Sequence, residues 1–165
     1  MEIERKFLVT NTPDLSEYRS NEITQGYISY SPEIRIRKKG DKFFITQKSE
    51  GTLVREELES EIDGVTYEIL CNMVKGNLIE KTRYEIPLSH DIIAELDVYH
   101  GQLNGLCTVE VEFESQEQAE SFIVPSWFGS DVTAEKKYKN RNLSEYNDLG
   151  ILIEKHLKVR TFPSD

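Results

Sequence analysis

The chain lacks most features that mark secreted or membrane proteins. Its two cysteines, Cys71 and Cys107, lie far apart and without the spacing of a metal site, which predicts a reduced, cytoplasmic protein. No apolar run approaches the roughly 20 residues that span a bilayer, so we expect no membrane partner. The N-terminus is charged from Glu2 and has no signal-peptide pattern.

Basic residues are also outnumbered, which bears on the choice of partner. The chain has 20 Lys and Arg against 30 Asp and Glu, a net charge of −10. Because nucleic-acid surfaces are basic, we expect no nucleic-acid partner. Salt screens charges beyond about 8 Å, so one local cluster can still oppose the overall sign. The three His are scattered, and neither a Ser–His–Asp arrangement nor a Gly-rich phosphate loop is visible.

The pattern of apolar residues and turns predicts a single domain, residues 1–165, made mainly of antiparallel strands. The turn signals "SPE", "KKGDK" and "SEGT" separate several of the strands. Strands are predicted at 2–9, 22–30, 33–39, 42–49, 53–62, 78–87, 94–100 and 106–114. Helices are predicted at 63–75, 116–124 and 142–158.

The first two predicted helices have recognisable caps and apolar sides. Asp63 is the expected N-cap of the first, whose apolar stripe is Val65, Ile69, Met73 and Val74. Ser115 and Gln118 form a capping box for the second. Its expected apolar side is Ala119, Phe122 and Ile123.

Charge occupies one face of strand after strand. In "MEIERKFLV", alternation places Glu2, Glu4 and Lys6 on one face of the strand. Carboxylates dominate the rows at 2–4, 57–61 and 95–114, whereas bases dominate 35–48 and 81–83. Two interpretations fit this pattern. Either the charged face of a half-buried sheet lies in water, or the sheet closes into a barrel that gathers the charges inside.

The inward arrangement carries a chemical consequence. Clustered carboxylates repel one another unless a divalent cation neutralises them, and oxygen ligands without His or Cys suit Mg²⁺ or Mn²⁺. Facing Arg and Lys side chains supply donors for phosphate oxygens. This interpretation predicts a polyphosphate site in a polar lumen, with helices packed on an apolar outer face.

The ordered motifs resemble those of the CYTH domain family, the triphosphate tunnel metalloenzymes. "EIERKF" is similar to the family's ExExK signature, and the similarity continues in the family's order to about residue 143. It includes "IRIRKKG", "FFITQKSEG", "VREELESEI", "IEKTRYEI", "VEVEFES" and "VTAEKKYKN". In the last motif Glu135 replaces the usual Asp and Lys137 the usual Arg. Residues from 150 onward match no motif.

The resemblance implies an eight-stranded antiparallel tunnel that binds triphosphate with divalent metal. The implied metal ligands are Glu2, Glu4, Glu110 and Glu112, helped by Glu114 or Asp97. The implied phosphate contacts are Lys6, Arg35, Arg37, Lys48, Arg55, Lys81 and Arg83, with Lys136 or Lys137 closing one mouth. Glu2, Glu4, Lys6, Glu59 and Glu110 form the expected catalytic group.

The family contains several activities, so the resemblance leaves alternatives. We expect metal-dependent hydrolysis of a small triphosphate, with inorganic triphosphate as the first choice because the strands show no obvious nucleoside pocket. Class IV adenylyl cyclase and thiamine triphosphatase are the alternative enzymes. A polyphosphate or nucleotide sensor is the alternative outside catalysis. The sequence does not indicate the oligomeric state.

Overall fold

One antiparallel sheet accounts for nearly all of the fold. The computed structural model describes residues 2–49 and 56–146. The strands are β1 (Ile3–Leu8), β2 (Arg19–Tyr30), β3 (Glu33–Lys39), β4 (Lys42–Lys48), β5 (Glu57–Ile62), β6 (Lys75–Pro87), β7 (Ile93–Tyr99) and β8 (Cys107–Phe113). They pair in the order β1-β8-β7-β6-β2-β3-β4-β5, and every neighbouring pair is antiparallel.

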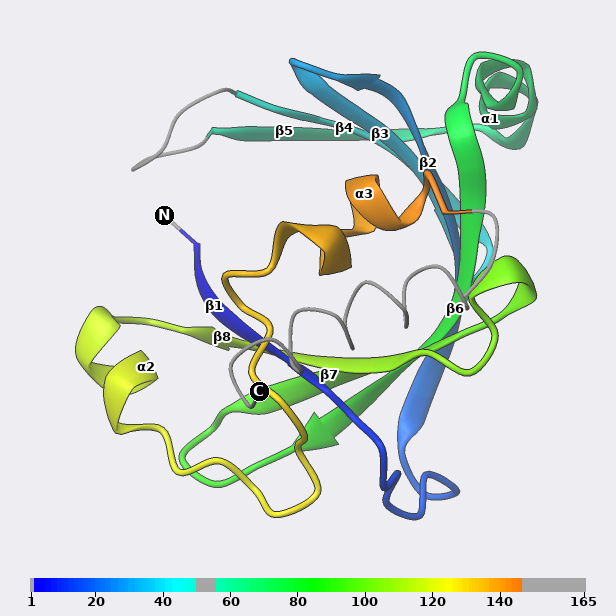
Figure 1. Ribbon diagram of the computed structural model, residues 1–165. Helices are drawn as coiled ribbons and strands as arrows, with labels where there is room; N and C mark the ends of the chain where they lie inside the picture. The colour runs from blue at the N-terminus through cyan, green and yellow to red at the C-terminus, as the bar shows by residue number, and fades with distance from the viewer. Residues whose placement is uncertain (1, 50–55, 147–165) are drawn as a thin grey trace, which may run out of the picture.

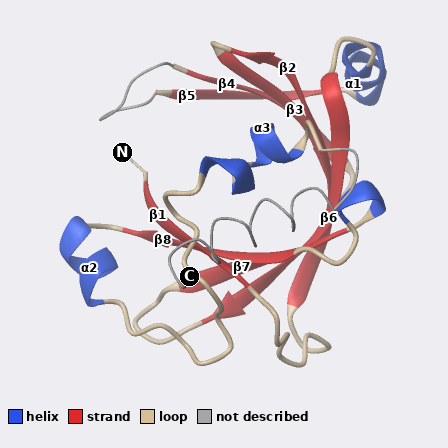
Figure 2. Ribbon diagram, in the orientation of Figure 1, coloured by secondary structure: helices blue, strands red, loops and turns tan. Residues whose placement is uncertain are grey.

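The sheet curls into a tunnel-like wall. Figure 1 shows β2 to β5 facing β1, β7 and β8 across a central space, with β6 joining the two sides. The end strands β1 and β5 share no ladder pairs within the described residues, but Lys48 Nζ lies 4.0 Å from a Glu2 carboxylate oxygen across this seam. The expected eight-stranded antiparallel tunnel architecture is confirmed. Figure 2 shows how little helix accompanies it.

The strand predictions hold, with differences at the ends. β2 begins at Arg19, three residues earlier than expected, because Arg19 pairs with Glu85 on β6. β6 begins at Lys75 because that residue pairs with Tyr27. Residues 53–55 of the strand predicted at 53–62 lie outside the described residues, which resume at Glu56.

The first helix is correctly placed, but the prediction of its buried side was wrong. Helix α1 (Gly64–Cys71) has the expected N-cap, with Asp63 accepting a hydrogen bond from Thr66 N. Its buried residue is Tyr67, whose ring lies 5.0 Å from that of Phe43 on β4. The predicted stripe residues Val65, Ile69 and Met73 are exposed. Tyr67 covers the sheet with a large ring, so the aliphatic side of this short helix turns outward.

Helix α2 (Gln116–Ser121) is shorter than predicted. Ser115 accepts from Gln118 N as expected, while the Gln118 side chain accepts from Glu114 N, one residue outside the usual capping box. Phe122 is already extended, and Ile123 is 88% exposed, so the predicted apolar side is correct only for Ala119 and Phe122.

Three short helical turns complete the described chain. They are the 3-10 turns η1 (Gly101–Leu103) and η2 (Lys136–Tyr138) and the helix α3 (Asn140–Leu143). In Figure 1 α3 lies between the two walls of the sheet, while α1 and α2 lie at its outer corners. The helix predicted at 142–158 therefore overlaps α3 at its start, and most of it lies outside the described residues. None of the described helices has the length and apolar character needed to cross a membrane.

Two apolar clusters hold the wall in place. The first packs α2 and Phe128 against the outer side of β1, β7 and β8, and includes Phe7, Leu96 and Val111. The second consists of Ile79, Tyr99, Leu103, Leu106, Val132, Tyr138 and Leu143. Because it joins β6 and β7 to residues 132–143, the second cluster fixes the chain after Asp131 against the sheet. That segment thereby becomes part of the cavity wall.

Candidate active site

A cavity of about 490 Å³ lies inside the curled sheet and is lined almost entirely by charge. Among the described residues, its acidic members are Glu2, Glu4, Glu33, Glu57, Glu95, Glu110, Glu112 and Glu135. Its basic members are Lys6, Arg35, Arg37, Lys48, Arg83, Lys136, Lys139 and Arg141. The cavity thus carries balanced charge inside a chain whose net charge is −10. The alternative in which the charged rows face bulk water does not fit this structure.

The carboxylates converge because β1 and β8 are paired in register. Glu4 lies directly opposite Glu112, and Lys6 lies opposite Glu110. On the next strand pair, Glu95 lies opposite Glu110. Burial of the carboxyl group, followed by repulsion from Glu110 and Glu2, raises the pKa of Glu4 to about 7. Glu4 therefore resists ionisation mainly because its carboxyl group loses water, and the neighbouring carboxylates add to that effect.

Basic side chains approach from the strands across the cavity. Arg35 and Arg37 lie on β3 and Lys48 lies on β4. Burial and the neighbouring guanidinium groups of Arg35 and Arg83 lower the pKa of Arg37 to about 10, which leaves it charged at neutral pH. The buried Nε of Arg35 has no hydrogen-bond partner among the described residues. An unsatisfied buried donor beside a cavity is a natural contact for an anion.

Arg83 belongs to a buried ion-pair network at the cavity wall. Its Nε and Nη2 donate to the two carboxylate oxygens of Asp97 at 2.8 and 2.9 Å, and its Nη1 lies 3.3 Å from Glu95. Lys81 Nζ donates to Asp97 at 2.9 Å and is fully buried. Burial opposes ionisation of Asp97, but Lys81 and Arg83 hold its pKa well below the usual range. Asp97 and Lys81 satisfy each other and do not line the cavity.

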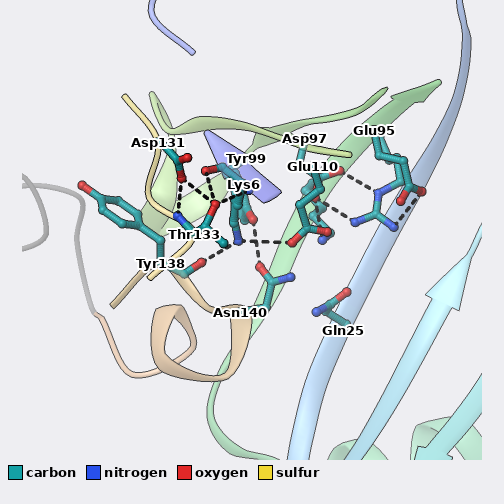
Figure 3. Close-up of polar contacts among 12 residues, drawn as sticks. Lys6, Gln25, Glu95, Asp97, Tyr99, Glu110, Asp131, Thr133, Tyr138 and Asn140 are labelled. Carbon is teal, nitrogen blue, oxygen red and sulfur yellow. Dashed lines mark hydrogen bonds and ion pairs between the residues drawn. The ribbon is translucent and has the colours of Figure 1, made fainter. Parts of the chain in front are cut away.

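Lys6 connects the acidic wall to the segment that follows β8. Figure 3 shows its ammonium between Tyr138 and Glu110. Nζ donates to the Tyr138 carbonyl at 2.6 Å and lies 3.8 Å from a Glu110 oxygen. The Lys6 backbone N–H also donates to Thr133 Oγ1, and its carbonyl accepts from Val132 N. Lys6 of β1 therefore anchors three residues of the later segment, Val132, Thr133 and Tyr138.

We refer to residues 131–146 as the strap. The strap contributes Lys136, Lys139 and Arg141 to the cavity lining. The Tyr99 hydroxyl donates to Asn140 Oδ1 at 2.8 Å, which fixes the start of α3 against β7. The strap thus supplies basic groups that no strand provides.

Most of the residues predicted for the site come together. Those lining the cavity are Glu2, Glu4, Lys6, Arg35, Arg37, Lys48, Arg83, Glu110, Glu112 and Lys136. Those outside the lining are Glu59, Lys81, Asp97, Glu114 and Lys137. Glu59 instead accepts from Thr46, and Glu114 is exposed at the end of β8. Arg55 lies outside the described residues.

The sequence interpretation missed several lining residues. Glu57 and Glu95 share strand faces with Glu59 and Asp97, so alternation placed them correctly without showing which member of each row reaches the cavity. Lys139 and Arg141 follow the "VTAEKKYKN" motif, and no period indicates that this irregular segment enters the lumen. Tyr27 also lines the cavity, although the pattern is equally typical of ordinary strand packing.

The donor set fits a hard divalent cation. Glu2, Glu4, Glu110 and Glu112 all line one cavity with carboxylate oxygens, and repulsion from Glu110 and Glu2 adds to desolvation in raising the pKa of Glu4. Within the part of the chain that the structure describes, no three His, Cys, Asp or Glu side chains lie close enough together to hold a metal ion by themselves. These residues therefore fit an open site in which phosphate oxygens and water complete the coordination.

Comparisons with known proteins agree with this architecture. The family model of the CYTH domain matches residues 1–125. An inorganic triphosphatase from Nitrosomonas europaea is 46% identical over 146 residues, which cover 87% of this chain and 96% of that protein. An inorganic triphosphatase from Acetivibrio thermocellus is 34% identical over 146 residues, covering 86% of this chain and 92% of the relative.

Solved structures show the same fold. A crystal structure of an inorganic triphosphatase matches with a TM-score of 0.72 and 42% identity, covering 90% of this chain and 97% of its own. A more distant Hippeastrum protein, described for its dominant triphosphatase activity, matches with a TM-score of 0.52 and 18% identity, over 73% of this chain and 83% of that one. By its sequence match over most of its length and by its tunnel fold, the chain belongs to the CYTH domain family.

Proposed function

We propose that the protein is a metal-dependent inorganic triphosphatase, which hydrolyses a phosphoanhydride bond of triphosphate. The observation that carries this proposal is the opposition of acidic and basic walls across one cavity. A chain of phosphates needs cationic donors along its length and a divalent cation to offset its remaining charge. The two relatives named as inorganic triphosphatases support the same substrate.

The basic residues bind and orient the phosphate chain. Arg35 and Arg37 present guanidinium donors from β3, and Arg83 is held rigidly by its two bonds to Asp97. Arg is suited to phosphate because its planar fork donates two parallel hydrogen bonds. Lys48, Lys136, Lys139 and Arg141 surround the same space from β4 and the strap.

The acidic residues would hold the metal. We assign Glu4 and Glu112 as its first ligands, because they lie opposite each other in the β1–β8 register, with Glu2 and Glu110 beside them. A bound Mg²⁺ or Mn²⁺ supplies charge neutralisation for the phosphate oxygens and a polarised water. Of the carboxylates, Glu2 and Glu110 are our candidates for orienting the attacking water. Asp97 and Glu114 lie outside the cavity lining and are not assigned as metal ligands, and Lys81 is bound to Asp97 and is not assigned as a phosphate contact. Glu59 accepts from Thr46 outside the lining.

The cavity lining favours inorganic triphosphate over a nucleotide. Among the described lining residues, the apolar or aromatic ones are Tyr27, Val132 and Tyr138. Val132 and Tyr138 belong to the packed second cluster. An adenine or thiazole ring therefore meets charged walls, which fits poorly with adenylyl cyclase or thiamine triphosphatase activity.

The experiment that tests this function compares three substrates. Purified protein is incubated with inorganic triphosphate, ATP or thiamine triphosphate, each with Mg²⁺, Mn²⁺ or excess EDTA, and the products are identified. We expect orthophosphate and pyrophosphate from inorganic triphosphate, with loss of turnover in EDTA. Cyclic AMP from ATP would establish the cyclase instead, and triphosphate binding without turnover under any metal would establish a sensor.

The Glu4→Gln variant tests the carboxylate wall in the same assay. We expect it to lose at least about 99% of turnover, since removing a metal ligand that acts on the transition state costs several kcal/mol. Its matched control is Glu17→Gln, because Glu17 is exposed and does not line the cavity. Wild-type turnover in Glu4→Gln would remove Glu4 from the metal site.

A further inference from the structure

A buried glutamine lies behind the basic wall. Gln25 on β2 is fully buried and stands directly opposite Arg37 on β3. Its Oε1 accepts from both Nε and Nη2 of Arg37, at 3.0 and 2.9 Å. Its Nε2 lies 3.4 Å from the Tyr27 hydroxyl. Arg37 and Tyr27 line the cavity, whereas Gln25 does not.

The chemistry of Arg37 fixes the direction of every hydrogen bond in this group. A guanidinium can only donate, so the oxygen of Gln25 must face it and the amide nitrogen must face Tyr27. An amide nitrogen donates, so the Tyr27 oxygen is the acceptor. The hydrogen of the Tyr27 hydroxyl is then free to point away from Gln25, and Tyr27 is one of the residues that line the cavity.

The neutrality of the amide matters as much as its shape. Arg83, on the same wall, is fixed by the carboxylate of Asp97, which offsets its charge. Gln25 accepts from the same two donor atoms of Arg37, Nε and Nη2, but on one amide oxygen, and it adds no negative charge beside the guanidinium. Burial raises the pKa of Tyr27 to about 12, so its hydroxyl keeps its hydrogen at neutral pH.

We propose that Gln25 is a positioning residue for triphosphate, which holds Arg37 as an uncompensated cation and Tyr27 as a donor, both directed into the cavity. The inference rests on the proposed function and adds a residue that does not touch the substrate. It also explains why a fully buried polar side chain stands at this position, since both ends of its amide are used.

The decisive variant is Gln25→Glu, which keeps the size of the side chain. Its carboxylate would still accept from Arg37, but it would neutralise the guanidinium and draw the Tyr27 hydrogen away from the cavity. We expect the affinity for inorganic triphosphate, measured by calorimetry without metal, to fall at least about tenfold, the factor that corresponds to about 1.4 kcal/mol. KM should rise by a similar factor in the Mg²⁺-supported assay.

Two further variants separate positioning from folding. Gln47→Glu is the matched control, because Gln47 is exposed on β4 and the substitution adds the same charge outside the cavity. It should leave affinity and KM unchanged. Gln25→Met removes both contacts and should lower the melting temperature more than Gln25→Glu does, because an ion pair with Arg37 supports folding. A merely structural role predicts that loss of affinity follows loss of stability in both variants.

Tyr27→Phe provides a test that does not depend on the stability of Gln25→Glu alone. It should weaken triphosphate binding in the wild type and have a smaller effect in the Gln25→Glu background, where the hydroxyl already faces away. Equal effects in both backgrounds, or wild-type affinity in Gln25→Glu, would overturn the role of Gln25. A wild-type protein that binds no triphosphate would overturn the proposed function first, before any variant is compared.

Discussion

Arg83 and Asp97 face each other across the β6–β7 ladder and are joined by two hydrogen bonds, of 2.8 and 2.9 Å. Both side chains are nearly inaccessible to solvent, and Lys81 adds a third hydrogen bond to the same carboxylate. This buried pair turns one guanidinium edge into a fixed part of the cavity wall. It also explains why an acidic residue on the charged face of β7 is not available as a metal ligand.

The Asp97→Asn variant should be strongly destabilised. It leaves the guanidinium of Arg83 buried without its counter-charge and removes the carboxylate to which Lys81 donates. Removing one partner of a buried ion pair costs about 3–5 kcal/mol of unfolding free energy. Urea unfolding at pH 7 measures the loss, and Asp41→Asn, in the exposed β3–β4 turn, is the control. A loss no larger than that of the control would contradict the structural role.

The stability advantage of the wild type over Asp97→Asn should depend on pH in one direction. Burial raises the pKa of Asp97, but Lys81 and Arg83 lower it further, so the folded pKa lies below the unfolded value of about 3.9. The ion pair therefore contributes fully above about pH 4 and is lost as pH falls toward the folded pKa. Unfolding curves of both proteins at pH 7, 4 and 3 should show a difference that begins to narrow below about pH 4, whereas a constant difference would count against this pairing.

Period-2 alternation was enough to assign most of the charged residues to one face of each strand, whereas the choice of a tunnel came from the resemblance to the CYTH family. Glu4 and Arg37 both lie on strands whose opposite faces are mainly apolar, and a face can be assigned from sequence without knowing its partner strand. Alternation does not show how deep a residue lies along the tunnel. Lys81 and Arg83 share a face, yet only Arg83 reaches the cavity lining.

The strap and α1 show where local patterns fail. Lys139 and Arg141 enter the cavity because the Tyr138 carbonyl and Asn140 are tied to distant strands, which no local pattern reveals. In α1, the aliphatic spacing predicted a buried stripe, but Tyr67 alone packs on the sheet. Long-range contacts decide both the position of the strap and the buried side of α1, and such contacts cannot be predicted from the local pattern of a single sequence.

Metal binding should stabilise the protein more at high pH than at low pH. The pKa of Glu4 is raised from its ordinary value of 4.5 to about 7. Between these two pH values the folded protein therefore holds a proton on Glu4 that the unfolded chain has lost. Without metal, the contribution of Glu4 to stability is therefore lost as pH rises through this window. Mg²⁺ requires the ionised carboxylate and must displace that proton below about pH 7.

Thermal unfolding with and without Mg²⁺ measures this effect. We expect the gain in melting temperature to be larger at pH 8 than at pH 6, because a ligand stabilises the folded state according to its affinity. In Glu4→Gln the gain should be small and nearly independent of pH. Equal gains at both pH values in the wild type would mean that Glu4 does not compete with a proton for the metal.

Lys6→Met should loosen one part of the strap and leave another part intact. The variant removes the bond from Nζ to the Tyr138 carbonyl and the approach to Glu110. The backbone bond from Val132 N to the Lys6 carbonyl does not depend on the side chain. Hydrogen exchange should therefore accelerate at the amides of Tyr138 and Lys139 but stay slow at Val132, which is the internal control. Uniform protection across the strap would show that the ammonium is not its anchor.

Gly76→Ala should destabilise the protein by about 1–3 kcal/mol, because two separate costs meet at this residue. Gly76 has a φ of +69°, and a Cβ there would lie 2.7 Å from the Ser144 carbonyl oxygen. That carbonyl accepts from Asn77 N and seats the end of the strap on β6. Gly64→Ala is the matched control, since its Cβ would meet only the Phe43 ring at ordinary contact distance. Chemical unfolding of both variants measures the difference in stability. Similar stabilities would mean that the strap moves away from β6 at no cost in free energy. The contact of the strap with β6 would then not be what holds its basic residues in the cavity.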